Sequence, residues 1–148
     1  MSAAKNSLGT VFSVETIVAG TYIAIEEIID IPGILGDKTG KIDVTSIDSV
    51  GYKEYINDAL RDAPEVSFKC NFTNGAGQLR VKTLADSGAN TSFKLVLPNK
   101  VTPATGTGTT IVRQGYISAR SITSGKGSQL MLEFTVQFSG APIETVAS

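Results

Sequence analysis

The chain has 148 residues, of which 41% are hydrophobic and 18% charged, a composition that suits one globular domain with its own apolar core. Its formal net charge is −1, so it lacks the general basic surface that holds nucleic acid through its phosphates, which argues against DNA binding as the main activity. It contains no histidine, which removes the commonest general base and metal ligand, and its single cysteine, Cys70, excludes an intramolecular disulfide.

The first nine residues are small and polar and predict a loose N-terminal arm. They lack the apolar centre of a secretion signal, and no stretch of the sequence approaches membrane-spanning length. We therefore expect a soluble protein that is made in the cytoplasm and does not enter a membrane.

Two strands are predicted before the first long connection. Residues 10–17 alternate between apolar and polar side chains, and residues 21–31 do so again. Glu27 falls in the apolar phase of the second run and Ile28 in its polar phase, which indicates a bulge near these two residues.

The connection at residues 36–68 is polar, charge-rich and longer than the roughly 12–15 residues that compact domains usually allow a loop. Within it, Asp48 and Ser49 form a plausible helix cap, and residues 51–60 place apolar side chains at helical spacing up to Pro64. The pattern predicts a short helix inside a functional loop.

The second half of the chain alternates clearly and predicts further strands at residues 65–72, 92–97, 111–122 and 130–138. Residues 78–88 predict a helix that ends at Gly88, with Leu79, Leu84 and either Val81 or Ala85 facing the sheet. Gly115 in mid-strand indicates a bulge or a close backbone approach. Gly140 and Pro142 indicate that the tail leaves the sheet.

These elements predict a mainly β fold with mostly antiparallel pairing. We expect a β-sandwich or partly open barrel with one flanking helix and a long inter-strand loop. A single domain would span residues 1–148, with flexible arms at about residues 1–9 and 141–148.

No motif indicates catalysis, a cofactor or a metal. The stretch 125–128 (GKGS) lacks the spacing of a phosphate-binding loop and predicts a hairpin turn. Glu26 and Glu27 would point to opposite faces of a strand. Cys70 falls in the apolar phase and predicts a buried, inert thiol. The remaining carboxylates do not follow the spacing of a calcium loop; they are Asp43, Asp48, Asp58, Asp62 and Glu65.

An ordered series of short motifs covers residues 23–142. It consists of residues 28–32 (IIDIP), 41–46 (KIDVTS), 52–56 (YKEYI), 60–63 (LRDA), 66–71 (VSFKCN), the helix from 78, 93–98 (FKLVLP), 115–117 (GYI) and 138–142 (FSGAP). In this order the motifs resemble those of the tail tube (major tail) proteins of long-tailed bacteriophages, including their D-x-T-S step and their sGxP ending.

The resemblance implies a non-enzymatic virion protein that forms hexameric rings, stacked into a hollow tail tube through which DNA passes. It also implies a tape-measure protein, a tail terminator and tail-tip or baseplate proteins as partners, with assembly in the host cytoplasm. The inter-ring loop would contain Lys38, Lys41, Asp43, Thr45, Ser46, Asp48, Tyr52 and Tyr55. Glu26 and Asp30 are candidates for the lumen face, where carboxylates would repel the phosphate backbone.

Two other functions remain open at this point. A tube subunit of a contractile secretion or injection system would share the same architecture. A monomeric β-sandwich that binds a ligand would need a concave site with exposed aromatic side chains, and the sequence has no tryptophan and few aromatic residues outside its apolar phases.

Overall fold

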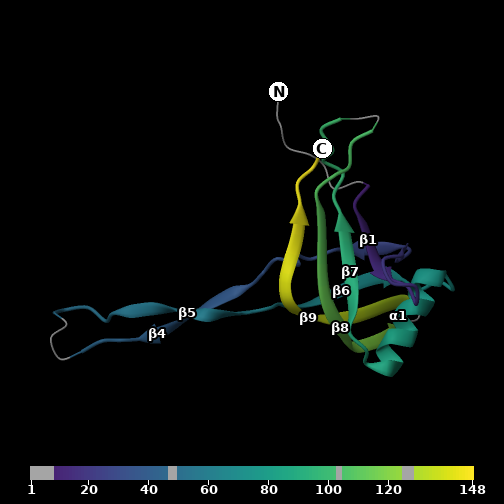
Figure 1. The fold of residues 1–148 in the computed structure, drawn as a ribbon. Coiled ribbons are helices and arrows are strands. Elements are labelled where there is room, and N and C mark those ends of the chain that lie inside the picture. Colours follow the sequence, from purple (N-terminus) through teal and green to yellow (C-terminus); the bar gives the residue numbers. More distant parts are fainter. Residues whose placement is uncertain (1–8, 47–49, 103–104, 125–128) are drawn as a thin grey trace.

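The computed structural model describes residues 9–46, 50–102, 105–124 and 129–148 (Figure 1). Within these ranges the fold is mainly β, with one helix. The elements are β1 (Val11–Glu15), β2 (Tyr22–Ala24), β3 (Ile28–Asp30), β4 (Lys38–Asp43), β5 (Tyr55–Asp62), β6 (Glu65–Asn71), α1 (Ala76–Ser87), β7 (Thr91–Val96), β8 (Thr110–Thr123) and β9 (Met131–Thr145). None of the described helical residues forms a segment long and apolar enough to cross a membrane.

Seven strands form one antiparallel sheet in the order β2-β1-β7-β8-β9-β6-β3. The sheet bends so that its two halves face each other. Phe12 on β1 stacks on Phe68 on β6 across the space between the halves, with ring centroids 4.4 Å apart. Residues 22–30 then cross between the two edges: Ile25 N donates to Phe12 O, and Asn71 N donates to Glu27 O. The predicted antiparallel β-sandwich with a flanking helix is confirmed, and among the described residues the sheet does not close into a barrel.

The core lies between these halves and is built from the alternating positions of the long strands. Phe68 also stacks on Phe134 of β9, with centroids 5.2 Å apart, and Phe93 of β7 meets Phe138 edge to face. Cys70 belongs to the same core and is fully buried, as predicted. Each fully buried phenylalanine or valine side chain of this core contributes about 1.5–3 kcal/mol to stability, because its apolar surface is removed from water.

Helix α1 lies against the sheet on the side of β8 and β1. It ends where predicted, because Gly88 adopts the left-handed conformation (φ 68°) and its N–H donates to Leu84 O. Val81 and Leu84 face the sheet as expected, but Leu79 is 53% exposed, so that part of the prediction is wrong. The buried stripe runs through residues 78, 81 and 84, and Leu79 lies beside it.

The predicted helix at residues 51–60 is also wrong. Tyr55–Asp62 is a strand, β5, which pairs with β4 through Ile42↔Ile56 and Lys38↔Asp62. A helix would satisfy its own backbone groups but leave those of β4 without this partner strand, whereas the β-hairpin pairs both segments and overrides the helical spacing. The proposed cap at Asp48 and Ser49 lies outside the described residues.

Two strand boundaries also differ from the prediction. The run at residues 21–31 divides into β2 and β3 where Glu27 takes a left-handed conformation (φ 58°), close to the expected irregularity. The chain does not leave the sheet at Gly140 and Pro142, because β9 continues to Thr145 along β8. Instead the ladder shifts register there, with Gly140 at φ 76°.

Candidate assembly surface

The hairpin of β4 and β5 projects from the body of the protein, on the side away from α1 (Figure 1). We call residues 38–62 the arm. Its two strands form a separate sheet and make at most a marginal contact with any other described strand or with α1. A two-stranded hairpin in water is only marginally stable by itself, so the arm depends on whatever covers it.

The two faces of the arm differ in chemistry. Ile42 lies directly opposite Ile56, and since paired residues point to the same side, both contribute to one face, which Val44 extends two residues further. Ile42 is 47% exposed and Ile56 53% exposed. On the other face, Lys41 Nζ lies 4.2 Å from the ring centroid of Tyr55, a cation–π contact.

The outer part of the arm holds its own polar groups in place. Thr45 N donates to Asp43 Oδ1 at 2.9 Å, and Glu54 N donates to Thr45 Oγ1 at 2.8 Å. Hydrogen bonding to Asp43 from the side chain of Thr45, and then from its backbone N–H, holds the pKa of the Asp43 carboxyl below its usual range. Beyond them, Val50 and Tyr52 are almost fully exposed. The end of the arm thus combines a preset backbone with exposed apolar and aromatic side chains.

Seven of the eight residues expected in a contact loop lie together on the arm; they are Lys38, Lys41, Asp43, Thr45, Ser46, Tyr52 and Tyr55. The eighth, Asp48, lies outside the described residues. Sequence reasoning missed the apolar face of Ile42, Val44 and Ile56. The alternation of Ile42 and Val44 was visible, but reading residues 51–60 as a helix concealed that Ile56 belongs to the same face.

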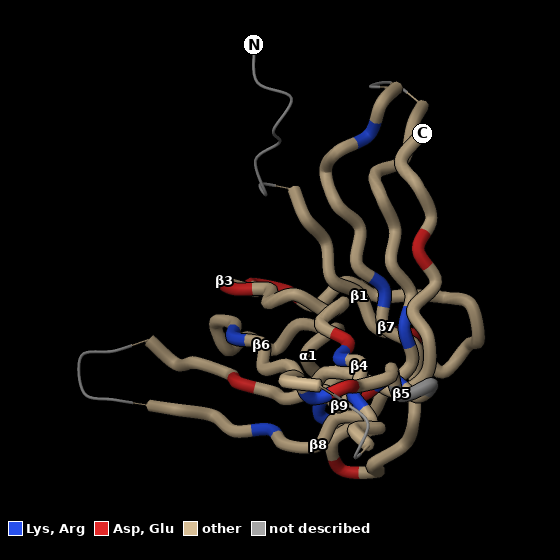
Figure 2. Tube along the Cα trace, turned by 90° about the vertical axis from the view of Figure 1, so that its left-hand side faces the viewer, with Lys and Arg blue, Asp and Glu red and all other residues tan. Residues whose placement is uncertain are grey.

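Glu26 and Asp30, the candidates for a lumen face, occupy different surroundings. The Glu26 carboxylate accepts hydrogen bonds from Gly77 N (3.0 Å) and Gln78 N (3.2 Å) at the start of α1. It thereby satisfies N–H groups that a helix start leaves without partners. Asp30 is exposed on the edge strand β3, where acidic positions gather in Figure 2. Which of these surfaces would face a lumen stays a prediction.

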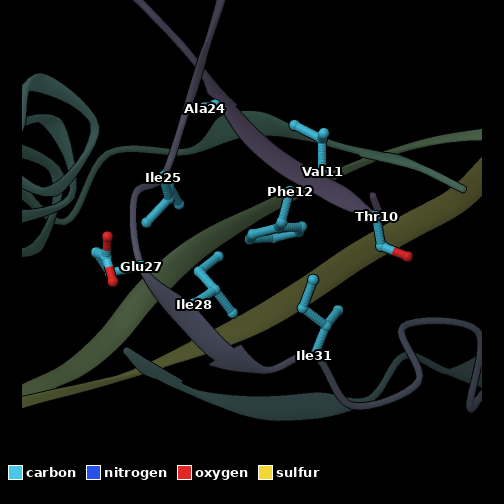
Figure 3. Close-up of a pocket in the computed structure, with 8 residues that line it drawn as sticks. All are labelled: Thr10, Val11, Phe12, Ala24, Ile25, Glu27, Ile28 and Ile31. Atoms are coloured by element: carbon cyan, nitrogen blue, oxygen red, sulfur yellow. The ribbon is translucent and has the colours of Figure 1, made fainter. Parts of the chain in front are cut away.

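A cavity of about 320 Å³ lies where residues 22–31 cross between the sheet edges. Figure 3 shows that the side chains of Phe12, Ile28 and Ile31 face this space while Glu27 stands at its margin. Six of its eight lining residues are apolar, and the two polar side chains, Thr10 and Glu27, stand apart at its margins, so they give a ligand no defined orientation.

The buried thiol of Cys70 offers little reactive chemistry. Burial, together with the nearby charge of Glu26, raises the pKa of the Cys70 thiol to about 11, so the thiolate is scarce at neutral pH. Among the described residues, no group of three or more histidine, cysteine or acidic side chains is placed to hold a metal ion.

Solved structures of tail and injection particles share this fold. A protein from the tail of an empty gene transfer agent particle, refined with C6 symmetry, superposes with a TM-score of 0.78 at 18% identity, over 97% of this chain and 100% of that one. One from the six-fold symmetrised baseplate of the anti-feeding prophage gives 0.75 at 10% identity, over 99% and 98%. The SPP1 tail tube gives 0.61 at 15% identity, over 93% and 76%.

No protein-family model matches the sequence, and no curated protein matches it at a significant level. The fold is thus one that this chain shares with proteins of gene transfer agent, phage and injection particles, and the likeness predicted from the ordered motifs is confirmed for the fold. By fold, this chain is similar to proteins of gene transfer agent and phage tails.

Proposed function

We propose that the chain is a structural subunit of a tail tube, which polymerises as stacked hexameric rings around a channel for DNA. The observation that carries this proposal is the arm, whose apolar face of Ile42, Val44 and Ile56 is exposed in the single subunit. In stacked rings, each arm would contact a second copy of the same chain, and that copy would cover its apolar face.

The strand edges of the main sheet support the same proposal. Strand β9 pairs with β6 up to Gln137, whereas its last residues pair with β8 alone within the described chain. The short strands β2 and β3 form the two outer edges. Exposed edges invite pairing with other chains, and a ring that joins neighbouring copies turns this hazard into an interface.

The charge balance suits a conduit. With a formal net charge of −1, the subunit has no excess of cations to hold the phosphate backbone. A lumen lined by neutral or acidic groups would let DNA slide, whereas a basic lining would retain it. The tape-measure protein, tail terminator and tip proteins belong to this proposal as partners of the tube.

A second candidate is the tube of a contractile injection system. Its support is the similarity to proteins from the anti-feeding prophage baseplate and from the sheath/tube terminator of an extracellular contractile injection system, the latter with a TM-score of 0.68 at 12% identity. A sheath gene beside this gene would favour the contractile system. A tape-measure gene without a sheath gene would favour a non-contractile phage tail.

Electron microscopy of the purified protein at rising concentration tests the proposal. Rings or tubes with six-fold symmetry are the expected result, and their central channel would be visible end on. Persistent monomers at high concentration, also after addition of preformed tail-tip complexes as nuclei, would contradict the proposal and favour a monomeric β-sandwich that binds a ligand.

A further inference from the structure

The most deeply buried charge among the described residues lies at the base of the arm. Arg113 on β8 is 1% exposed, and its guanidinium contacts parts of the chain that are far apart in sequence. It donates to both carboxylate oxygens of Asp37, at 2.5 and 2.9 Å, and to Ile34 O at 3.0 Å. A fourth bond runs to Gly140 O on β9, also at 3.0 Å.

Two of these partners lie on the segment that leads into the arm. Asp37 directly precedes β4, and Ile34, three residues earlier, is itself buried in the core. The other partner, Gly140, lies at the register shift of β9, the irregularity that turns its carbonyl toward the guanidinium. Arg113 therefore joins the entry of the arm to the two longest strands of the sheet.

The exit of the arm is held by two longer bonds, from Phe138 N to Pro64 O at 3.2 Å and from Gln137 Nε2 to Ala63 O at 3.3 Å. Strand β5 is followed within two residues by β6, and neither arm strand packs appreciably on the main sheet within the described chain. A forked pair between a guanidinium and a carboxylate constrains direction as well as distance, because two parallel hydrogen bonds must be kept at once. Without the forked pair, the direction of the arm would depend mainly on its exit, where single and longer bonds constrain direction less.

We propose that Arg113 is the positioning residue of the arm: through its forked bond to Asp37 it sets the direction in which the arm leaves the body, and polymerisation depends on that direction. Only the statement that polymerisation depends on this direction rests on the proposed function. The direction itself is a property of the single subunit. A preset direction lowers the conformational entropy lost when the arm docks on a neighbouring copy.

The direction can be measured on the monomer with two spin labels. Lys53→Cys places one label on the arm, and Ser121→Cys places the other on an exposed position of β8. The native Cys70 is fully buried and its thiol pKa is raised to about 11, so it does not compete for the label at neutral pH. The width of the label-to-label distance distribution then reports the freedom of the arm.

The test variant is Asp37→Asn, which removes the charge and one acceptor oxygen but keeps the size of the side chain. The matched control is Asp86→Asn, which breaks the exposed pair with Lys82 on α1 in the same way, at 3.0 Å. Because Asp37→Asn leaves Arg113 buried and without its counter-ion, a second variant, Arg113→Met with Asp37→Asn, removes both charges.

We expect a narrow distance distribution for the parent and for Asp86→Asn, and a broad one for both variants at the base of the arm. We also expect the concentration needed for polymerisation to rise by roughly tenfold in those variants, within the usual range of coupling between two sites. Circular dichroism on each variant establishes that the body is folded when its distances are recorded.

The inference would be overturned if the label-to-label distance distribution stayed as narrow as in the parent. This applies to Asp37→Asn and to Arg113→Met with Asp37→Asn together. A broad distribution with an unchanged polymerisation threshold would also overturn it, since the direction of the arm would then be irrelevant to assembly. If the parent forms no polymer at all, the proposed function fails, while the distance measurement still decides whether Arg113 directs the arm.

Discussion

At the scale of single residues, polar side chains in this fold mostly bind backbone groups of the same subunit. Gln78 is an example, since its buried amide donates to Glu26 O and to Asn71 O and thereby joins α1 to the end of β6. Buried amides of this kind stabilise a fold only while all their partners remain in place. The start of α1 is therefore a junction of three segments, with Glu26 at its centre.

We expect Glu26→Ala to lower the free energy of unfolding by about 1 kcal/mol, because two N–H groups at the start of α1 lose their acceptor. The measurement is urea unfolding followed by circular dichroism. Asp30→Ala, on the exposed edge of β3, is the matched control and should change the free energy by less than about 0.5 kcal/mol. Equal losses in both variants would contradict a capping role.

The Asp37 carboxyl group should make stability depend on pH. The hydrogen bonds from Arg113 hold its pKa below the usual range, with further help from the charges of Arg113 and of Arg61 on β5. A depressed folded-state pKa means that this stabilisation is present above the pKa of an unfolded aspartate, about 3.9. It is lost as the pH falls through the lower folded-state value.

As the pH falls below about 4, the free energy of unfolding should therefore decrease more steeply for the parent than for Asp37→Asn. The asparagine of the variant has no proton to bind at this position. Unfolding curves at a series of pH values for both proteins isolate the contribution, since every other carboxyl group is shared. Parallel pH profiles would show that the ion pair contributes nothing to stability.

At the scale of elements, the arm is a hairpin whose described apolar side chains do not belong to the core of their own subunit. Its strands satisfy each other's backbone groups, which explains why a sequence with helical spacing forms strands here. Its Ile42 and Ile56 side chains remain about half exposed, so their burial would add most of its stabilisation only on assembly.

Amide hydrogen exchange should show this difference directly. In the monomer, the described amides of the arm should exchange much faster than those of β8 and β9, because a lone hairpin opens at little cost. In the assembled form the same amides should become protected, because contact with a neighbouring copy would add the burial that the formed but marginally stable hairpin lacks in the monomer. Strong protection of the arm already in the monomer would contradict this expectation.

Removing the apolar face of the arm should block assembly and leave the fold intact. The double variant Ile42→Thr and Ile56→Thr keeps β-branched side chains suited to strands, so the unfolding free energy of the monomer should change by less than about 1 kcal/mol. Ile17→Thr is the matched control, because Ile17 is 89% exposed but lies outside the arm, two residues after the end of β1. Tubes are expected from the control alone, as judged by electron microscopy.

A deletion of residues 38–49 should also leave a folded subunit that does not polymerise. Because β4 is the partner of β5, this deletion leaves β5 unpaired, so a deletion of residues 38–62 that removes both strands is the cleaner version. Normal tubes from either deletion would contradict a role of the arm in stacking.

At the scale of the whole molecule, stability rests on the contact between the two halves of one bent sheet. Phe68 is central to it, since its ring stacks on Phe12 across the core and on Phe134 beside it. Within the described chain, the separate sheet of β4 and β5 packs appreciably on neither half, so it could not keep the halves together if this contact were lost. The body thus behaves as a rigid base from which the arm projects.

Phe68→Ala should therefore cost about 3–5 kcal/mol of unfolding free energy, through lost burial and the cavity left behind. Thermal or urea unfolding provides the measurement. Tyr52→Ala removes an aromatic ring that is 86% exposed and should leave the stability of the monomer within about 0.5 kcal/mol of the parent. A small loss for Phe68→Ala would mean that the two halves of the sheet do not depend on each other.

The sequence by itself determined the local elements wherever a single periodic pattern was present and no distant strand partner overrode it. Alternation over residues 65–71 and 131–138 marked the core strands, and Gly88 marked the end of α1, because side-chain spacing and left-handed backbone are local properties. The fold class followed from these elements, and the ordered motifs added the likeness to tail tube proteins.

Only the tertiary structure decided how the arm is built and held. Residues 51–60 fit a helix by their spacing, and nothing local shows that β4 lies beside them to pair with. The bond from Arg113 to Asp37 joins positions 76 residues apart, and in the sequence Arg113 is one charged residue in an apolar strand. A contact of that range depends on how the sheet bends, which no local pattern encodes.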